Sequence, residues 1–189
     1  HRPVTGFDLL HADARAVLDA WRPPDPAQAI LAQEYLAHLR SYPLAMSRDN
    51  APGHLTGSAL VVDEDRTRTL LTLHPRVGRW LQLGGHCEPA DLSLRGTALR
   101  EAREESGIDG VAISDEPLRL DRHALTCSGG PTVHWDVQYL AVVGRDARES
   151  ISAESDDLRW FPLDALPAGV DDSVRALVDA VLAPDGTSG

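Results

Sequence analysis

The chain of 189 residues contains no lysine, only two cysteines and only 5% aromatic residues. It has no apolar run of the roughly 20 residues that a membrane-spanning helix needs, and no signal-peptide pattern at its start. The cysteines, Cys87 and Cys127, lie too far apart for a CxxC motif, which favours reduced thiols over a disulfide or a zinc pair. We therefore predict a cytoplasmic protein that does not enter a membrane.

Because lysine is absent, all 18 basic residues are arginines, and they are outnumbered by 29 acidic residues, for a net charge of −11. This sign argues against a nucleic-acid partner, since binding to a phosphate backbone needs a basic surface. A small anionic substrate stays compatible with the charge, because a bound divalent metal ion can reverse the local sign.

Hydrophobic residues make up 42% of the chain and charged residues 25%, as in ordinary globular proteins. Apolar residues have helical spacing on both sides of the break at RPPDP, and residues 47–54 are typical of a linker. From residue 51 onward, short apolar runs of strand length alternate with turns. We predict a helical N-terminal extension over residues 1–50 and one domain over residues 51–189.

In this domain we expect strands near residues 57–63, 68–75, 79–83, 117–127, 132–144 and 156–162, and helices over Leu92–Ser106 and residues 171–182. Asp91 is the expected N-cap of the first helix, and Gly107 is its expected C-terminal stop. The order of elements indicates a mixed α/β protein of the α+β type.

Three glutamates, Glu101, Glu104 and Glu105, share one face of the first predicted helix, because residues three and four apart are neighbours. They lie near its C-terminus, where the helix dipole and their mutual repulsion disfavour negative charge. Such a cluster suits a hard divalent cation such as Mg²⁺ or Mn²⁺. An E-x-x-E-E run alone is more typical of a solvated helix. Here, however, a glycine pair (Gly84 and Gly85) and an acidic loop precede it.

The segment Gly85 to Ile108 resembles the signature of the Nudix hydrolase family, which is G, five residues, E, seven residues, then R-E-apolar-x-E-E-x-G-apolar. The stretch REAREESGI, which begins at Arg100, matches the second half at every specified position. Two departures precede it: Asp91 stands where the family has glutamate, and eight residues instead of seven separate it from Arg100. The resemblance implies the Nudix fold, a mixed β-sheet sandwiched between helices.

The resemblance also implies an enzyme that uses Mg²⁺ or Mn²⁺ to hydrolyse the diphosphate linkage of a small nucleoside diphosphate derivative. At the matching positions the metal ligands are Glu101, Glu104 and Glu105, joined by the carbonyl group of Gly84. Arg100 orients Glu101 and the loop.

The general base has two candidates, Glu105 and Glu154; Glu154 lies in a loop before the last predicted strand, where a plain exposed acid is an equal reading. His123 and His134 lie on predicted strands, and their spacing specifies no metal site. The candidates for substrate binding flank the glycine pair: Arg76, Arg79, Trp80 and His86. For Trp80 a place in the core is the more common role, and for His86 packing within the loop is an equal alternative.

Two other functions stay open: a Nudix-fold module that binds a nucleotide metabolite without cleaving it, and an isomerase of prenyl diphosphates, for which no second motif is present. The apolar stripe of the N-terminal helices indicates only that they bury against something. They could cover an edge of the sheet, form a homodimer interface or close over the pocket.

Overall fold

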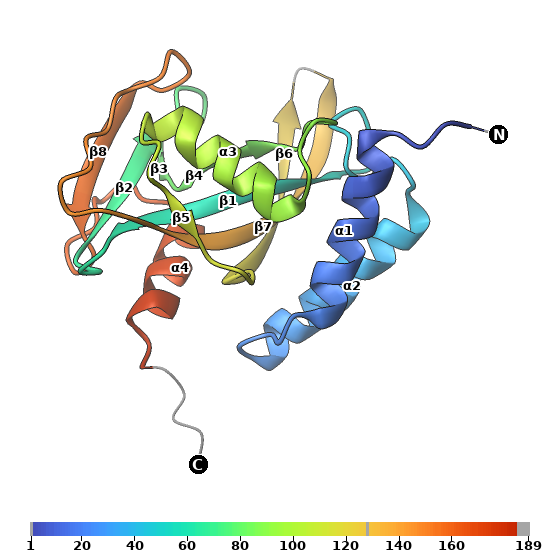
Figure 1. Ribbon diagram of the computed structural model, residues 1–189, viewed down its shortest axis with the longest axis horizontal. Helices are drawn as coiled ribbons and strands as arrows, with labels where there is room; N and C mark the ends of the chain where they lie inside the picture. The colour runs from blue at the N-terminus through green and yellow to red at the C-terminus, as the bar shows by residue number, and fades with distance from the viewer. Residues whose placement is uncertain (1, 128, 185–189) are drawn as a thin grey trace.

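The computed structural model describes residues 2–127 and 129–184 (Figure 1). Its helices are α1 (Gly6–Ala20), α2 (Pro26–Ser41), α3 (Leu94–Ser106) and α4 (Asp172–Leu182). Its strands are β1 (His54–Asp63), β2 (Arg68–Leu73), β3 (Trp80–Leu81), β4 (Leu83–His86), β5 (Ala112–Ile113), β6 (Arg119–Cys127), β7 (Gly130–Val143) and β8 (Asp157–Pro162). No helix within the described part of the chain is long and apolar enough to cross a membrane.

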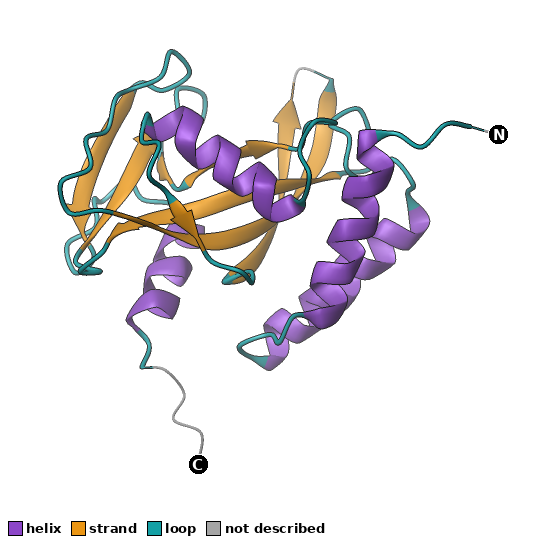
Figure 2. Ribbon diagram, in the orientation of Figure 1, coloured by secondary structure: helices purple, strands orange, loops and turns teal. Residues whose placement is uncertain are grey.

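The strands form one mixed sheet around a long central pair, β1 and β7, which run parallel over ten paired positions (Figure 2). All other pairings are antiparallel: β4 and β2 with β1, β6 and β5 with β7, and β3 and β8 with β2. The central strands therefore join segments that lie about 80 residues apart in the sequence, such as His54 and His134.

Side chains of β1 point alternately to the two faces of the sheet, as strand geometry requires. Leu55 and Val61 belong to the core on the α3 side, whereas Leu60 and Val62 pack into a second core beneath α4. The sheet thus lies between α3 and α4, as the Nudix resemblance predicts.

The N-terminal helices α1 and α2 pack against each other and share the core on the α3 side, to which they contribute Leu10, Leu18, Tyr35 and Leu39. The side chain of Gln28 in α2 bonds to the backbone of Leu120 in β6, with its Nε2 donating over 3.0 Å and its Oε1 accepting over 2.7 Å. Among the described strands β6 pairs with β7 alone, and this contact bonds the outer backbone of β6 at Leu120. A division of the chain at residue 50 stays a prediction.

Several predicted boundaries are wrong. Helix α3 begins after Ser93, whose hydroxyl accepts the N–H of Gly96 over 2.9 Å, so Ser93 and not Asp91 is the N-cap. The predicted linker ends earlier than expected, because His54 already pairs within β1. The glycine pair lies inside β4 rather than after a strand, and β5 was not predicted. The stop at Gly107 is confirmed, with a left-handed φ of 69°.

Candidate active site

Arg100 lies at the centre of the site that α3 and β4 form. Its Nε and Nη2 donate to the two carboxylate oxygens of Asp91, over 2.7 and 3.1 Å. Its Nη1 bonds to Glu101 over 2.9 Å and to Glu104 over 3.2 Å, and Nη2 also donates to the carbonyl oxygen of His86 over 2.8 Å. One guanidinium group therefore ties the helix to the loop and to the end of β4.

Asp91 forms the bidentate pair with arginine in spite of its shorter side chain. It is buried, and it also accepts the N–H of Glu88 and the hydroxyl of Thr97 over 2.9 and 2.8 Å. Burial opposes its ionisation, but the bonds from Arg100, Glu88 and Thr97 outweigh this effect and lower the pKa of Asp91. Asp91 in place of glutamate and the one extra residue before Arg100 are therefore compatible with each other. The loop brings the shorter acid within bonding distance of Arg100.

Two of the three helix glutamates lie where a negative charge is unfavourable. Burial, the nearby charge of Glu101 and a smaller contribution from Glu154 raise the pKa of Glu105 to about 8. Burial is also the main cause that raises the pKa of Glu101, and Glu104 and Glu154 add to it. Glu154 is exposed on the loop before β8, and its charge contributes to both of these pKa shifts.

The glycine pair allows β4 to approach α3 closely. A Cβ atom built on Gly85 would lie 2.6 Å from the carboxylate of Glu101, and one on Gly84 would lie 2.3 Å from Cβ of Ser58 in β1. The N–H of Gly84 donates to Glu105 over 3.3 Å. A side chain at Gly84 would therefore collide with β1, whereas one at Gly85 would displace the carboxylate group of Glu101.

In chemical type the donors fit a hard cation. Three carboxylates lie on one helix, and the two whose charge is disfavoured, Glu101 and Glu105, would gain from a divalent ion. Among the described residues, the carboxylate oxygens of these three glutamates do not lie close enough together to share one ion. Arg100 holds Glu101 and Glu104, and Glu105 turns toward the N–H of Gly84.

The substrate-binding candidates lie in three different places. Arg76 is exposed on the loop between β2 and β3, and Arg79 pairs with Asp171 at the start of α4 over 3.1 Å. Trp80 packs against the core beneath α4, with its ring centroid 4.8 Å from that of Phe161. His86 points to the face of the sheet away from Gly85 and Glu101, since neighbouring residues of a strand alternate. Their roles in binding stay predictions.

Sequence reasoning missed a polar row on that far face. Thr56 and Ser58 of β1 donate to the buried carboxylate of Asp136 in β7 over 2.8 and 2.6 Å. His54 and His134 continue the row as direct partners in the sheet. The available signal was the alternation of polar and apolar residues in HLTGSAL and HWDVQYL.

Of the two cysteines, Cys87 is a buried free thiol, and burial raises its pKa to about 12. The charge of the nearby Asp91 also raises this pKa but contributes less than burial does. The side chain of Cys127 lies outside the described residues, so the prediction that both are reduced thiols concerns Cys87 alone here.

The family model described as NUDIX domain matches residues 53–180, which is more than half of the chain. The chain belongs to the Nudix family. A search of curated proteins found no match. With its family and a MutT NUDIX hydrolase among its structural neighbours, the protein is an enzyme of the Nudix pyrophosphohydrolase type.

Solved structures agree with this assignment. The NUDIX domain of Shewanella oneidensis NrtR complexed with ADP ribose is 26% identical, with a TM-score of 0.51 over 79% of this chain and 95% of that one. The MutT NUDIX hydrolase of Burkholderia pseudomallei is 25% identical, with a TM-score of 0.51 over 67% and 96%. An Ap4A hydrolase of C. elegans is 19% identical, with a TM-score of 0.53 over 67% and 93%, a likeness that shows the fold alone.

Proposed function

We propose that this enzyme hydrolyses the diphosphate linkage of a small nucleoside diphosphate derivative with the help of Mg²⁺ or Mn²⁺. The observation that carries the proposal is the set of three carboxylates on α3 beside the glycine strand, with Arg100 and Asp91 bracing them. The ADP-ribose complex of the NrtR domain supports a nucleoside diphosphate as the ligand class.

Hydrolysis of a diphosphate requires water to attack a phosphorus atom that anionic oxygens shield, so charge neutralisation and positioning do most of the work. A divalent ion held by Glu101, Glu104 and Glu105, with the carbonyl of Gly84, would supply that neutralisation and lower the pKa of bound water. Arg100 keeps Glu101 against β4, and Asp91 fixes the guanidinium group that does so.

For the general base we keep two candidates. Glu105 is half-buried beside Gly84, close to where α3 and β4 meet. Glu154 is exposed on the loop before β8, and its charge adds to the raised pKa of both Glu101 and Glu105. Loss of turnover in Glu154→Gln with unchanged Mn²⁺ affinity would assign the base to Glu154. Loss of turnover in Glu105→Gln with full turnover in Glu154→Gln would favour Glu105.

The test is product release from ADP-ribose, nucleotide sugars, dinucleoside polyphosphates, (d)NTPs and coenzyme A, each with Mg²⁺ or Mn²⁺. We expect metal-dependent turnover of at least one compound. It should fall about 100-fold or more in Glu104→Gln and Glu105→Gln, as for the loss of a group acting on the attacking water. The matched control is Glu34→Gln, an exposed glutamate of α2 whose surface pair with Arg122 is worth at most about 1 kcal/mol.

The alternative, a module that binds a nucleotide metabolite without cleaving it, predicts tight binding of one compound and no turnover of any. The prenyl diphosphate isomerase predicts isomerised product without phosphate release. The cytoplasmic location, the homodimer and the absence of a nucleic-acid partner stay predictions.

A further inference from the structure

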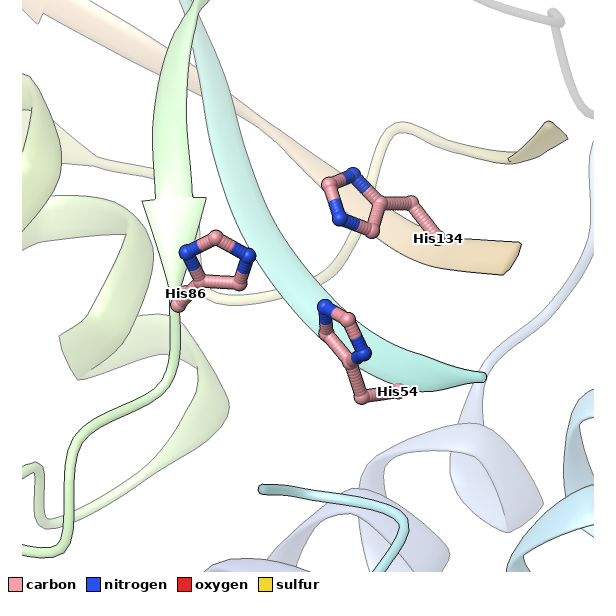
Figure 3. A group of neighbouring side chains, drawn as sticks. All are labelled: His54, His86 and His134. Atoms are coloured by element: carbon pink, nitrogen blue, oxygen red, sulfur yellow. The ribbon is translucent and has the colours of Figure 1, made fainter. Parts of the chain in front are cut away.

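Three histidines from three adjacent strands face one another on the sheet surface away from α3 (Figure 3). His54 comes from β1, His134 is its direct partner in β7, and His86 comes from β4 opposite Thr56. One ring nitrogen of each lies within 4.8 Å of one ring nitrogen of the other two. The ring centroids are 4.7 to 5.3 Å apart.

Two histidines of this trio have buried ring nitrogens that no other described residue bonds. His54 is only 2% exposed, and neither of its ring nitrogens has a hydrogen-bond partner among the described residues. The same holds for Nε2 of His134. A buried polar atom without a partner is costly, so natural proteins leave few of them. Two such imidazoles, with the ring of His86 beside them, indicate a ligand that accepts their lone pairs.

We propose that His54, His86 and His134 bind a divalent transition metal ion of the Zn²⁺ class. Imidazole nitrogen is a preferred ligand for Zn²⁺, Ni²⁺ and Cu²⁺, whereas Mg²⁺ and Mn²⁺ select oxygen. A tetrahedral Zn²⁺ with bonds of about 2.0–2.1 Å needs nitrogens about 3.3 Å apart, so small ring rotations complete the site. Three protein ligands leave a fourth position for water or for an anionic oxygen atom of a small molecule.

Phosphate, the other ligand class that histidines hold, fits these rings less well. Burial, with the neighbouring rings, lowers the pKa of His134 to about 3, and burial also lowers the pKa of His54. These two rings are therefore neutral near pH 7, which is the form that binds metals and not the cationic form that attracts phosphate.

The site is separate from the α3 carboxylates. A side chain on Gly85 would point at Glu101, so the next residue, His86, points to the opposite face. The backbone carbonyl of His86 accepts from Arg100, and this contact is the link between the two groups. The two sites also differ in donor type, nitrogen on one face and oxygen on the other.

The test uses the protein without a histidine tag, stripped with a chelator and dialysed against Zn²⁺, with bound metal measured by mass spectrometry. Visible spectra after addition of Co²⁺ report nitrogen ligation independently of stoichiometry. The variants are His54→Gln and His134→Gln. The matched controls are His11→Gln, an imidazole on α1 outside the cluster, and the double variant Glu104→Gln with Glu105→Gln.

We expect one Zn²⁺ per chain in the wild type and in both controls, and at least a tenfold weaker affinity in the two histidine variants. Zn²⁺ should raise the melting temperature of the wild type and of His11→Gln, but not that of His134→Gln. Equal melting temperatures of the wild type and His134→Gln in chelator would show that this variant folds. It then provides the test even if His54→Gln, which changes a buried residue, does not fold. Unchanged Zn²⁺ stoichiometry in His134→Gln, no Zn²⁺ in the wild type, or loss of Zn²⁺ in the glutamate variant would each overturn the proposal.

Discussion

At the scale of single residues, the thiol of Cys87 shows how burial sets reactivity. The side chain is 4% exposed, and its pKa is raised from 9.0 to about 12. Because the thiolate is the reactive form, the native thiol should react with iodoacetamide near pH 7 about a thousandfold more slowly than a free cysteine. We expect complete alkylation only after unfolding in urea, measured by mass spectrometry.

The experiment is done in Cys127→Ser, so that the modified thiol is Cys87 alone. The same protein in urea supplies the reference rate. If Cys87 were alkylated rapidly in the folded protein, the end of β4 next to it would open readily. This result would contradict the burial of its side chain.

Gly85 is the residue at which the backbone comes closest to the helix carboxylates. In Gly85→Ala the new methyl group would lie 2.6 Å from the end of the Glu101 side chain, which is flexible and can move away. We therefore expect the free energy of unfolding to change by about 1 kcal/mol or less. Turnover should fall about 10- to 100-fold, as when the support of a metal ligand is lost.

Gly110→Ala is the matched control, since no atom lies within 4 Å of a Cβ atom built there. Steady-state kinetics and urea unfolding on both variants separate activity from stability. Full activity of Gly85→Ala would show that the position of Glu101 against β4 is not needed for hydrolysis.

At the scale of elements, helix α3 could be predicted almost completely, because its signals are local. The 100° spacing places the glutamates on one side, and Gly107 ends the helix. The error at its start has a physical cause. Asp91 and Ser93 are both good caps, and the sequence does not show that Asp91 is engaged by Arg100, nine residues away.

The histidine cluster could not be predicted in the same way, because it depends on the register between strands. His54 and His134 meet through a parallel pairing across 80 residues, and His86 joins through an antiparallel one. A shift of one residue in either pairing would send a ring to the other face of the sheet. The alternation of polar and apolar residues predicts which side chains of a strand lie on its polar face. It does not predict which strand lies beside it.

The engagement of Asp91 makes the stability of α3 and its loop depend on pH. Its folded pKa lies below the ordinary value of 3.8 through the bonds from Arg100, Glu88 and Thr97, which outweigh the opposing effect of burial. A carboxyl group of this kind stabilises the fold above pH 3.8, and the contribution is lost as the pH falls through its folded pKa. Asp91→Asn should cost about 1.5–3 kcal/mol at pH 7, the size of hydrogen bonds to a charged group.

The difference between wild type and Asp91→Asn should therefore shrink as the pH is lowered from about 5 to below 3.8, in urea unfolding of the metal-free protein. Asp115→Asn is the control, because the side chain of Asp115 is 99% exposed. A difference that stays constant over this range would contradict the assigned charge pairing.

At the scale of the whole molecule, the N-terminal helices are joined to the sheet by specific bonds as well as by packing. The indole N–H of Trp21 donates to the carbonyl of Pro117 over 2.8 Å, and the hydroxyl of Tyr35 donates to the carbonyl of Asp136 over 2.7 Å. His38 stacks on Trp135 with ring centroids 4.4 Å apart. We expect one unfolding transition, in which far-ultraviolet circular dichroism and tryptophan fluorescence coincide.

Gln28 tests this coupling with a single side chain. Its amide group pairs with both the N–H and the carbonyl group of Leu120, as a neighbouring strand would, and so satisfies the free edge of β6. Gln28→Ala should leave both backbone groups without their partner and lower the free energy of unfolding by about 1–3 kcal/mol, with an unchanged urea m-value. Gln33→Ala, an exposed glutamine of the same helix, should lie within about 0.5 kcal/mol of the wild type. If Gln28→Ala instead split the transition in two, α1 and α2 would unfold apart from the sheet, and the chain would consist of two separate units.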